Sequence, residues 1–250
     1  MQLYKLTNFL NNLLDNKQYK DDAINGLQVE NNGLINKIFT AVDANLHTIR
    51  QCENNSLLIV HHGLFWGNQF PVTGVHYEKM KTLISANVAL YASHLPLDAH
   101  AEVGNNIQLL RQMGAEITGS FGEYHGATIG FKGEFDDAIE ISEAAQRLQR
   151  VIQADVRIFS FSAQKKIKKI CAVSGDPGMK ILEEYKNSGI DLMITGESSH
   201  ILYNYMEDNQ LNLLCGGHYA TETLGVKALG QLAASEFLIP FQFIDHSTGH

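Results

Sequence analysis

The sequence lacks paired cysteines, long apolar runs and any extended basic stripe. Its three cysteines, Cys52, Cys171 and Cys215, lie far apart and include no CxxC pair. This spacing excludes a disulfide framework and a zinc ribbon, and it fits a reducing compartment. No window approaches the roughly 18 apolar residues that a membrane-spanning helix needs, and the first residues lack the basic segment of a signal peptide. We therefore expect a cytoplasmic protein with no membrane partner.

Basic residues are in the minority. There are 19 Lys and Arg residues against 27 Asp and Glu residues, which gives a formal net charge of −8 with the 11 histidines counted as neutral. The one short basic run covers residues 165–169, and we interpret it as a solvated entry into a strand. Because binding along a nucleic-acid backbone needs a broad cationic surface, the charge balance argues against a nucleic-acid partner.

The chain is long enough for a full hydrophobic core. Its 250 residues are 44% apolar, which excludes disorder and low-complexity structure. At roughly 100–200 residues per domain, this length fits one large domain or two small ones.

Short apolar runs alternate with stretches of helical periodicity along most of the chain. Such alternation indicates βαβ units, so we predict an α/β protein with a largely parallel, helix-covered sheet. Several glycines break the alternation within residues 119–161, where we expect a few antiparallel strands and a helix at or near a domain junction. The predicted helices cover 2–15, 46–53, 77–86, 137–149, 178–187 and 219–235, and the predicted strands cover 37–42, 57–60, 88–92, 168–173, 191–195, 211–214 and 241–244.

Nearly every predicted strand ends in a polar or glycine-rich cluster. Ligands of open parallel sheets bind at the carboxyl ends of the strands, and these ends carry most of the residues in the chain that could bind a metal. The clusters cover residues 61–63, 93–100, 174–178, 195–197 and 216–218.

Three of these clusters contain imidazole and carboxylate groups. His61 and His62 point to opposite faces of an extended strand, so both can bind a metal only where the strand gives way to a turn, which Gly63 would supply. A pair of hydrogen-bonded histidines without a metal is the alternative for this cluster.

His94 and Asp98 form the second cluster. They are four residues apart, and Pro96 between them rules out an uninterrupted helix. We therefore expect a loop that presents an imidazole and a carboxylate, with His100 beyond it. Asp98 could equally cap the helix expected near residues 104–113.

His218 and Glu222 form the third cluster. They are spaced i, i+4 at the start of a predicted helix, which places both side chains on one face. The alternative for Glu222 is a carboxylate that stabilises the helix N-terminus.

Three such clusters together predict a divalent-metal site. Mixed imidazole and carboxylate ligands suit Zn, Mn, Fe or Ni. Five ligands are too many for one tetrahedral zinc with an open position, but they suit two metals that share a bridging carboxylate.

The motifs that contain these residues resemble those of the GTP cyclohydrolase 1 type 2 homologue family, the NIF-three-like dinuclear metal proteins. The segment 25–29 (NGLQV) is similar to the opening motif of that family, and the resemblance runs in order across essentially the whole chain. The length matches the short bacterial form, without the inserted domain that some members carry. The matching motifs are His61-His62-Gly63, 94–100 (HLPLDAH), Thr195-Gly196-Glu197 and 217–222 (GHYATE).

The resemblance implies two interlocked α/β domains, which we place at residues 1–120 and 121–250. Members of this family resemble toroidal homohexamers, trimers of dimers, whose metal sites face an internal cavity. His94 would lie near the metals as a supporting or substrate-facing residue. Two divalent cations per subunit would be bound by His61, His62, Asp98, His218 and Glu222, with Glu222 bridging them.

The resemblance also implies a hydrolase that acts on a nucleotide-like substrate, by water attack at C8 of the guanine ring of GTP and loss of formate. Two cations would lower the pKa of the attacking water. His94 and Glu197 are the candidates for proton transfer, although Glu197 could instead cap the helix that follows it. The alternatives are hydrolysis of a phosphoester or amide bond, and a non-enzymatic metal-binding scaffold.

Overall fold

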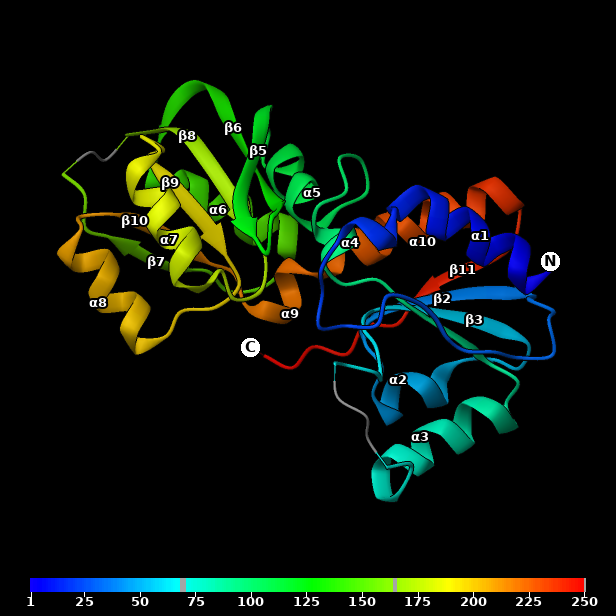
Figure 1. Cartoon of the computed structure of the whole chain (residues 1–250). Helices are drawn as coiled ribbons and strands as arrows, with labels where there is room; N and C mark the ends of the chain where they lie inside the picture. Colours follow the sequence, from blue (N-terminus) through cyan, green and yellow to red (C-terminus); the bar gives the residue numbers. More distant parts are fainter. Residues whose placement is uncertain (68–70, 164–165, 250) are drawn as a thin grey trace. The chain divides into compact units, whose positions relative to one another are not determined.

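The computed structural model describes residues 1–67, 71–163 and 166–249 and divides them into two compact units, each with its own β-sheet (Figure 1). The first unit contains Met1–Leu97 and Val226–His246, and the second contains Asp98–Gly225 and the segment from Ser247 onward. Both are α/β, as the sequence predicts. The chain first passes into the second unit after Leu97, and the segment from Val226 to His246 returns to the first unit.

The first unit contains a five-stranded sheet in the order β1-β4-β3-β2-β11. Its last four strands run parallel, which confirms the predicted parallel arrangement, and β1 pairs antiparallel with β4. The antiparallel β1 coincides with the NGLQV motif, which the apolar pattern alone did not mark as a strand. The strands are β1 (Gly26–Val29), β2 (Lys37–Asp43), β3 (Ser56–His62), β4 (Ala89–Ala92) and β11 (Phe241–Phe243).

Helices cover both faces of this sheet, with α1 and α10 on one side and α2 and α3 on the other (Figure 1). The helix α1 confirms the prediction for residues 2–15, since four of its leucines at helical spacing are buried: Leu3, Leu6, Leu10 and Leu14. The interior strands β3 and β4 are buried along almost their whole length. The helices are α1 (Leu3–Leu14), α2 (Leu46–Gln51), α3 (Gly74–Ser85) and α10 (Thr223–Phe237), with a short 3-10 turn at Asn16–Gln18.

The second unit contains a six-stranded mixed sheet in the order β5-β6-β8-β9-β10-β7. Only β8, β9 and β10 run parallel to one another, so the prediction of a largely parallel sheet is wrong for this unit. The antiparallel strands β5, β6 and β7 confirm the expectation for residues 119–161. The strands are β5 (Glu116–Tyr124), β6 (Ala127–Glu140), β7 (Arg157–Ser160), β8 (Lys166–Val173), β9 (Leu192–Thr195) and β10 (Asn212–Cys215).

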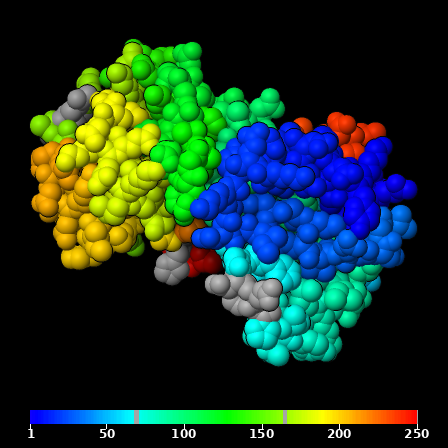
Figure 2. Space-filling model, viewed as in Figure 1, coloured from blue at the N-terminus to red at the C-terminus, as the bar shows by residue number. Residues whose placement is uncertain are grey.

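Two predicted helices have different bounds in the structure. The one predicted at 137–149 begins only at Ile141, because residues 137–140 continue β6 as an edge of the antiparallel sheet. The one predicted at 219–235 is divided at Glu222 into α9 and α10. Helices α7 and α8 form much of the surface of the second unit that is visible in Figure 2, in yellow and orange. The helices are α4 (Leu95–Asp98), α5 (Asn105–Gln112), α6 (Ile141–Ile152), α7 (Gly178–Asn187), α8 (His200–Asp208) and α9 (His218–Thr221).

The short basic run and the lack of long apolar segments can both be followed in the structure. Lys166, Lys168 and Lys169 are exposed at the start of β8, as expected for a solvated strand entry, while Lys165 lies outside the described residues. Among the helices of the described ranges, none combines the length and the apolar character that crossing a membrane requires.

Gly130 in β6 allows close packing that a side chain would prevent. A Cβ atom there would lie 2.4 Å from the carbonyl oxygen of Ala172 and 2.7 Å from Val173 Cγ2. We expect Gly130→Ala to lower the free energy of unfolding by about 1–3 kcal/mol, as overpacking does, in a urea titration. Gly67→Ala is the control, because the nearest atom to its Cβ would be 3.8 Å away. Equal stability of both variants would contradict this account of the sheet.

Candidate metal centre

Three histidines of the first unit gather at the carboxyl ends of two neighbouring strands. His61 and His62 are the last two residues of β3, and His94 follows β4. One ring nitrogen of each histidine lies within 4.8 Å of the other two, so this group could hold a metal ion. The ring centroids are 4.7 Å apart for His61 and His62 and 5.0 Å apart for His61 and His94.

Each of these rings makes a hydrogen bond through Nδ1. Histidines that bind metals usually donate one ring N–H to a carbonyl or carboxylate, which fixes the tautomer and leaves the other nitrogen as the ligand. The three rings therefore have Nε2 as the nitrogen suited to bind a cation. The Nδ1 contacts are His61 with Ser93 O at 2.9 Å, His62 with Asp43 Oδ1 at 2.9 Å, and His94 with Asp21 Oδ1 at 3.0 Å.

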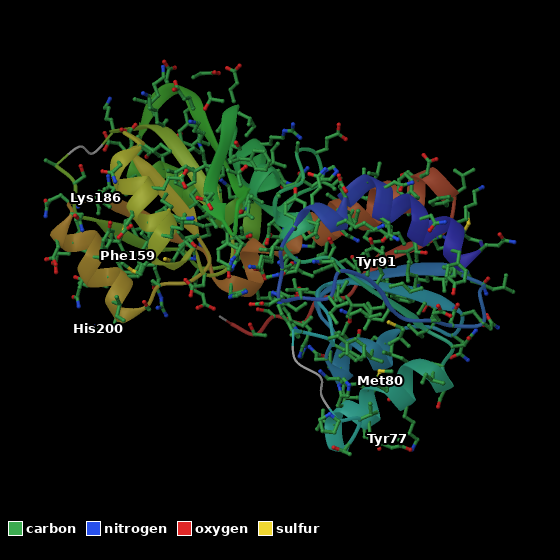
Figure 3. All side chains as sticks on the ribbon, viewed as in Figure 1. Tyr77, Met80, Tyr91, Phe159, Lys186 and His200 are labelled. Carbon is green, nitrogen blue, oxygen red and sulfur yellow. The ribbon has the colours of Figure 1, made fainter. Side chains whose placement is uncertain are left out.

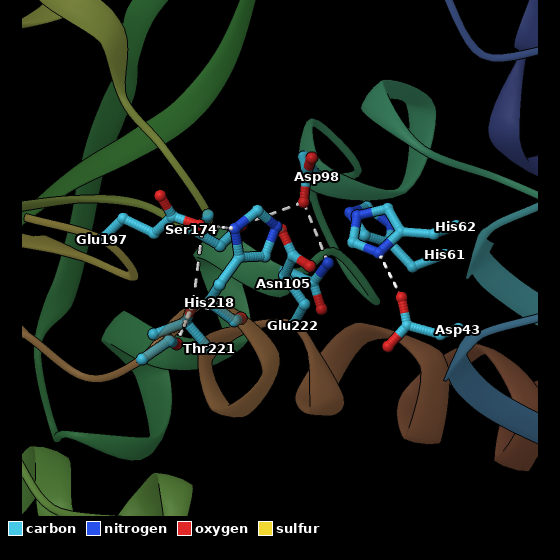
Figure 4. A network of polar contacts seen from close by, with 12 residues as sticks. Asp43, His61, His62, Asp98, Asn105, Ser174, Glu197, His218, Thr221 and Glu222 are labelled. Carbon is cyan, nitrogen blue, oxygen red and sulfur yellow. Dashed lines mark hydrogen bonds and ion pairs between the residues drawn. The ribbon is translucent and has the colours of Figure 1, made fainter. Parts of the chain in front are cut away.

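The backbone explains how adjacent histidines come to share one group. Strand β3 ends at His62, which pairs in register with Asp43 at the end of β2, so the carboxylate lies directly beside the ring (Figure 4). Gly63 is required for packing and not for a left-handed turn, since a Cβ atom there would lie 2.4 Å from Gln28 Nε2 and 2.7 Å from Ala92 Cβ. Glycine is therefore needed at position 63 because the backbone there lies close to Gln28 and Ala92, and not for the turn expected from the sequence.

Asp21 is a site residue that sequence reasoning missed. Its side chain is only 3% exposed and accepts hydrogen bonds from Ala23 N, Asn25 Nδ2 and Leu95 N as well as the contact with His94. Burial raises the pKa of this carboxyl, but the hydrogen bond and charge of His94 and the bond from Asn25 outweigh burial and hold the pKa at about 2. The carboxylate is thus ionised at neutral pH beside the His94 ring.

The NGLQV motif orders the segments around these histidines. Asn25 Oδ1 accepts a hydrogen bond of 2.7 Å from His94 N, and Gln28 Oε1 accepts one of 2.8 Å from Leu64 N. These amide side chains hold the backbone that follows β3 and β4. The motif therefore supports the histidines. Its resemblance to the opening motif of the family was the one sequence signal that pointed to Asn25 and Gln28.

In the second unit, His218 lies between two carboxylates. Its Nδ1 is 2.6 Å from Glu197 Oε1, and its Nε2 is 3.2 Å from Glu222 Oε1 (Figure 4). The hydrogen bond with Glu222 raises the pKa of His218, burial opposes it, and the charge of Glu222 and the contact with Glu197 add to the rise, so that the pKa is about 9. The i, i+4 spacing thus brings His218 and Glu222 together as predicted, although Glu222 follows α9 as its C-cap.

The prediction that Glu197 could cap the following helix is wrong. The N-cap of α8 is Ser199, whose side chain accepts a hydrogen bond from Leu202 N. Glu197 instead holds the Nδ1 side of His218, the same arrangement that carboxylates provide for His62 and His94.

Asp98 is buried in the second unit, with 5% of its surface exposed. Its Oδ1 accepts hydrogen bonds from Asn105 Nδ2 at 2.9 Å and Ser174 Oγ at 3.0 Å. It does not cap α5, whose N-cap is Gly104. The expectation of a loop is also wrong: Leu95–Asp98 is the single helical turn α4, because proline is tolerated in a first helical turn.

The segment after β8 contacts all three proposed ligands of the second unit. Ser174 donates to Asp98, and a Cβ atom at Gly175 would lie 2.7 Å from Glu222 Oε1 and 3.2 Å from His218 Nε2. Gly175 also has a positive φ of 62°, so both its conformation and its surroundings call for glycine. His100, in contrast, accepts hydrogen bonds from Glu102 N and Val103 N and orders its own loop.

The chain is similar to known proteins over its whole length, both in sequence and in fold. The family model described as Duf34/NIF3 (NGG1p interacting factor 3) matches residues 1–249. A Pyrococcus horikoshii protein named GTP cyclohydrolase 1 type 2 homolog is 44% identical over 248 residues, which are 98% of each chain. The protein in the crystal structure of TTHA1606 from Thermus thermophilus is 34% identical in sequence, with a TM-score of 0.89. The protein in a solved structure described as protein ybgI, of unknown function, is 28% identical, with a TM-score of 0.91. Both comparisons cover 100% of each chain.

The Asp21 carboxylate should stabilise the fold. Its pKa of about 2 against an ordinary value of 3.8 corresponds to about 2 kcal/mol at neutral pH. A lowered pKa stabilises the protein above the ordinary value, and this contribution is lost as the pH falls through the folded value. We therefore expect Asp21→Asn to lower the free energy of unfolding by about 2 kcal/mol at pH 7, with a smaller difference in acid. The neighbouring exposed Asp22→Asn is the control, and an equal effect of both would contradict the role of Asp21.

His218 should titrate near pH 9 in chelator-treated, metal-free protein, as measured by NMR of the histidine ring protons. A raised pKa stabilises the fold fully below the ordinary value of 6.5, and this contribution is lost as the pH rises through about 9. Glu222→Gln should move the midpoint toward 6.5, because it removes the largest cause of the shift. A His218 midpoint near 6.5 in the unaltered protein would refute this electrostatic description.

Proposed function

The chain belongs to the Duf34/NIF3 family, and we propose that it is a metal-dependent hydrolase that binds two divalent cations through His61, His62, Asp98, His218 and Glu222. The observation that carries the proposal is the hydrogen bond at Nδ1 of His61, His62 and His218, which leaves Nε2 of each ring as the possible ligand. This is the usual arrangement around histidines that bind metals.

The donor set fits such cations. Imidazole nitrogens and carboxylate oxygens without thiolates suit Zn, Mn, Fe or Ni. Asp98 and Glu222 are buried, with 5% and 2% of their surfaces exposed, and buried carboxylates are favourable when they are hydrogen-bonded or coordinate a metal. Glu222 is the proposed bridging ligand, because a carboxylate offers two oxygens. The proposed ligands come from both units of the chain.

When bound, two cations would lower the pKa of an attacking water and stabilise negative charge that develops on the substrate. His94 and Glu197 are the proposed proton-transfer residues. Asp21 would hold the Nδ1 proton of His94, so that Nε2 can accept a proton. Glu197 would keep the Nδ1 proton of His218 in place through Oε1, across a contact of 2.6 Å, and take up a proton of the reaction at its other carboxylate oxygen. His94 also lies in the three-histidine group of the first unit, so its competing role is that of an additional ligand.

The proposed reaction is the ring-opening hydrolysis of GTP. A first water would attack C8 of the guanine ring and open the ring to a formamide, and a second water would hydrolyse the formamide and release formate. The name of the Pyrococcus relatives, GTP cyclohydrolase 1 type 2 homolog, supports this choice of substrate over other nucleotides. Two alternatives remain to be separated from ring-opening hydrolysis by the tests below. One is hydrolysis of a phosphoester or amide bond, and the other is a metal-binding scaffold without activity.

We also propose that the protein forms a toroidal homohexamer in the cytoplasm. Helix α3 supports an assembly through the first unit, because Val75, Tyr77 and Ile84 are 63%, 47% and 61% exposed. Tyr77 lies on the outer side of this helix (Figure 3). Tyr77 and Ile84 are two helical turns apart on one face of α3, and exposed apolar side chains on one face often mark contacts between proteins. The free thiols of Cys52, Cys171 and Cys215 are consistent with a reducing compartment.

Metal binding is tested by the metal content of purified protein after dialysis. We expect two divalent ions per chain, and His62→Ala and Glu222→Gln should reduce the affinity by more than about 100-fold, because each removes a ligand rather than a supporting group. The exposed His200→Ala is the control and should keep both ions. Full metal content in both ligand variants would refute the proposed site.

Turnover is tested by incubating the metal-loaded protein with GTP and measuring formate and phosphate. We expect formate release that a chelator abolishes and that His62→Ala and Glu222→Gln lack, because the water would no longer be activated. Release of phosphate without formate would instead support a phosphoesterase. Protein that holds two metals and acts on no nucleotide in a panel would support the scaffold.

A further inference from the structure

A cavity of about 540 Å³ lies entirely within the second unit, at the carboxyl ends of β9 and β10. Its volume is in the range of small-molecule sites, and the carboxyl ends of parallel strands are where such sites form. One wall contains Glu197, the residue that is hydrogen-bonded to His218. The lining residues are Ala154, Asp155, Arg157, Gly196, Glu197, Ser198, Cys215, Gly216, Gly217, Ala220, Ser247 and Gly249.

Because many of the lining residues are small, main-chain atoms form much of the cavity wall. Gly196 and Gly216 are glycines for packing reasons, since a Cβ atom at Gly196 would lie 2.8 Å from His218 Cα, and one at Gly216 would lie 2.7 Å from Ile152 Cδ1. Gly217 has a positive φ of 89°. With no side chains at these positions, a ligand can approach the backbone closely.

Arg157 is the cation of this cavity. It begins the edge strand β7 and pairs in register with Cys215 at the end of β10. Both residues line the cavity. Burial raises the pKa of the Cys215 thiol to about 12, while the hydrogen bond with Ser198 and the positive charge of Arg157 act in the opposite direction. Among the described residues, no carboxylate forms an ion pair with Arg157.

The two carboxylates of the wall differ in their surroundings. Glu197 Oε1 contacts His218 Nδ1 at 2.6 Å. This carboxylate is therefore already engaged with the His218 ring. Asp155 is exposed at the same wall as Arg157. A ligand that fits both would carry an anionic group for Arg157 and a neutral hydrogen-bond donor, such as a hydroxyl or amino group, for Asp155.

We propose that this cavity binds the substrate and that Arg157 recognises its phosphate group, with the reacting part of the molecule toward Glu197 and His218. The inference deepens the proposed function and rests on it. A guanidinium can donate two parallel hydrogen bonds to a phosphate, a geometry that a lysine ammonium does not reproduce. A nucleoside phosphate carries both required groups, a phosphate and donors on the sugar and base. Inorganic phosphate shares the anionic chemistry only.

The test compares GMP, guanosine and inorganic phosphate by isothermal titration calorimetry with the metal-loaded protein. Wild-type protein should bind GMP about tenfold more tightly than guanosine, a difference of about 1.4 kcal/mol. Arg157→Gln should abolish this preference without changing the affinity for guanosine, and Arg157→Lys should restore part of it. Arg150→Gln is the matched control, because Arg150 is an exposed arginine of α6 that does not line the cavity.

GMP and guanosine would both bind beside the same metal ions. The difference between their affinities therefore isolates the contribution of Arg157. An unchanged preference in Arg157→Gln, or binding of inorganic phosphate without GMP, would overturn the proposal. Arg157-dependent binding of GMP without release of formate from GTP would support the cavity and refute the proposed hydrolysis. Formate release with an unchanged KM for GTP in Arg157→Gln would refute the cavity and leave the hydrolysis intact.

Discussion

The arrangement of the candidate site depends on one interaction, the hydrogen bond that each histidine makes through Nδ1. An imidazole that is not held rotates about its side-chain bonds and exchanges tautomers, so its Nε2 lone pair has no fixed direction. A carbonyl or carboxylate at Nδ1 fixes both the ring and the proton. The four acceptors are Ser93 O for His61, Asp43 for His62, Asp21 for His94 and Glu197 for His218.

These acceptors are in place because of strand pairing and tight packing. Asp43 is beside His62 through the register of β2 and β3, and Ser93 follows β4, the neighbour of β3 on the other side. The same edges leave no room for side chains at Gly63 and Gly175, where a Cβ atom would meet atoms 2.4 Å and 2.7 Å away. In each unit, the polar groups are therefore positioned by that unit's own sheet, whose interior is buried and apolar.

The charges around the histidines connect orientation to ligand binding. Asp21 remains ionised beside His94, and Glu197 and Glu222 flank His218 and raise its pKa to about 9. A cation that binds at Nε2 of His218 must displace the proton held there, so the carboxylates that stabilise the metal-free state also supply charge for the metal. Glu197 has a further position, in the wall of the cavity that contains Arg157. The proposed metal ligand and the proposed phosphate contact thus adjoin one carboxylate within the second unit.

The sequence by itself determined the α/β class, most helices and interior strands, and the gathering of histidines at the strand ends, because these follow from local periodicity and from the alternation of elements. It also brought His218 and Glu222 together, since their spacing is a helical one. It could not determine Asp21, because 73 residues separate this carboxylate from His94 and no periodicity relates them. The antiparallel β1, the turn α4 across Pro96 and the return of α10 and β11 to the first unit were likewise decided only by tertiary structure. Pairing between distant strands and the filling of a common core select these features, and neither has a local signal in the chain.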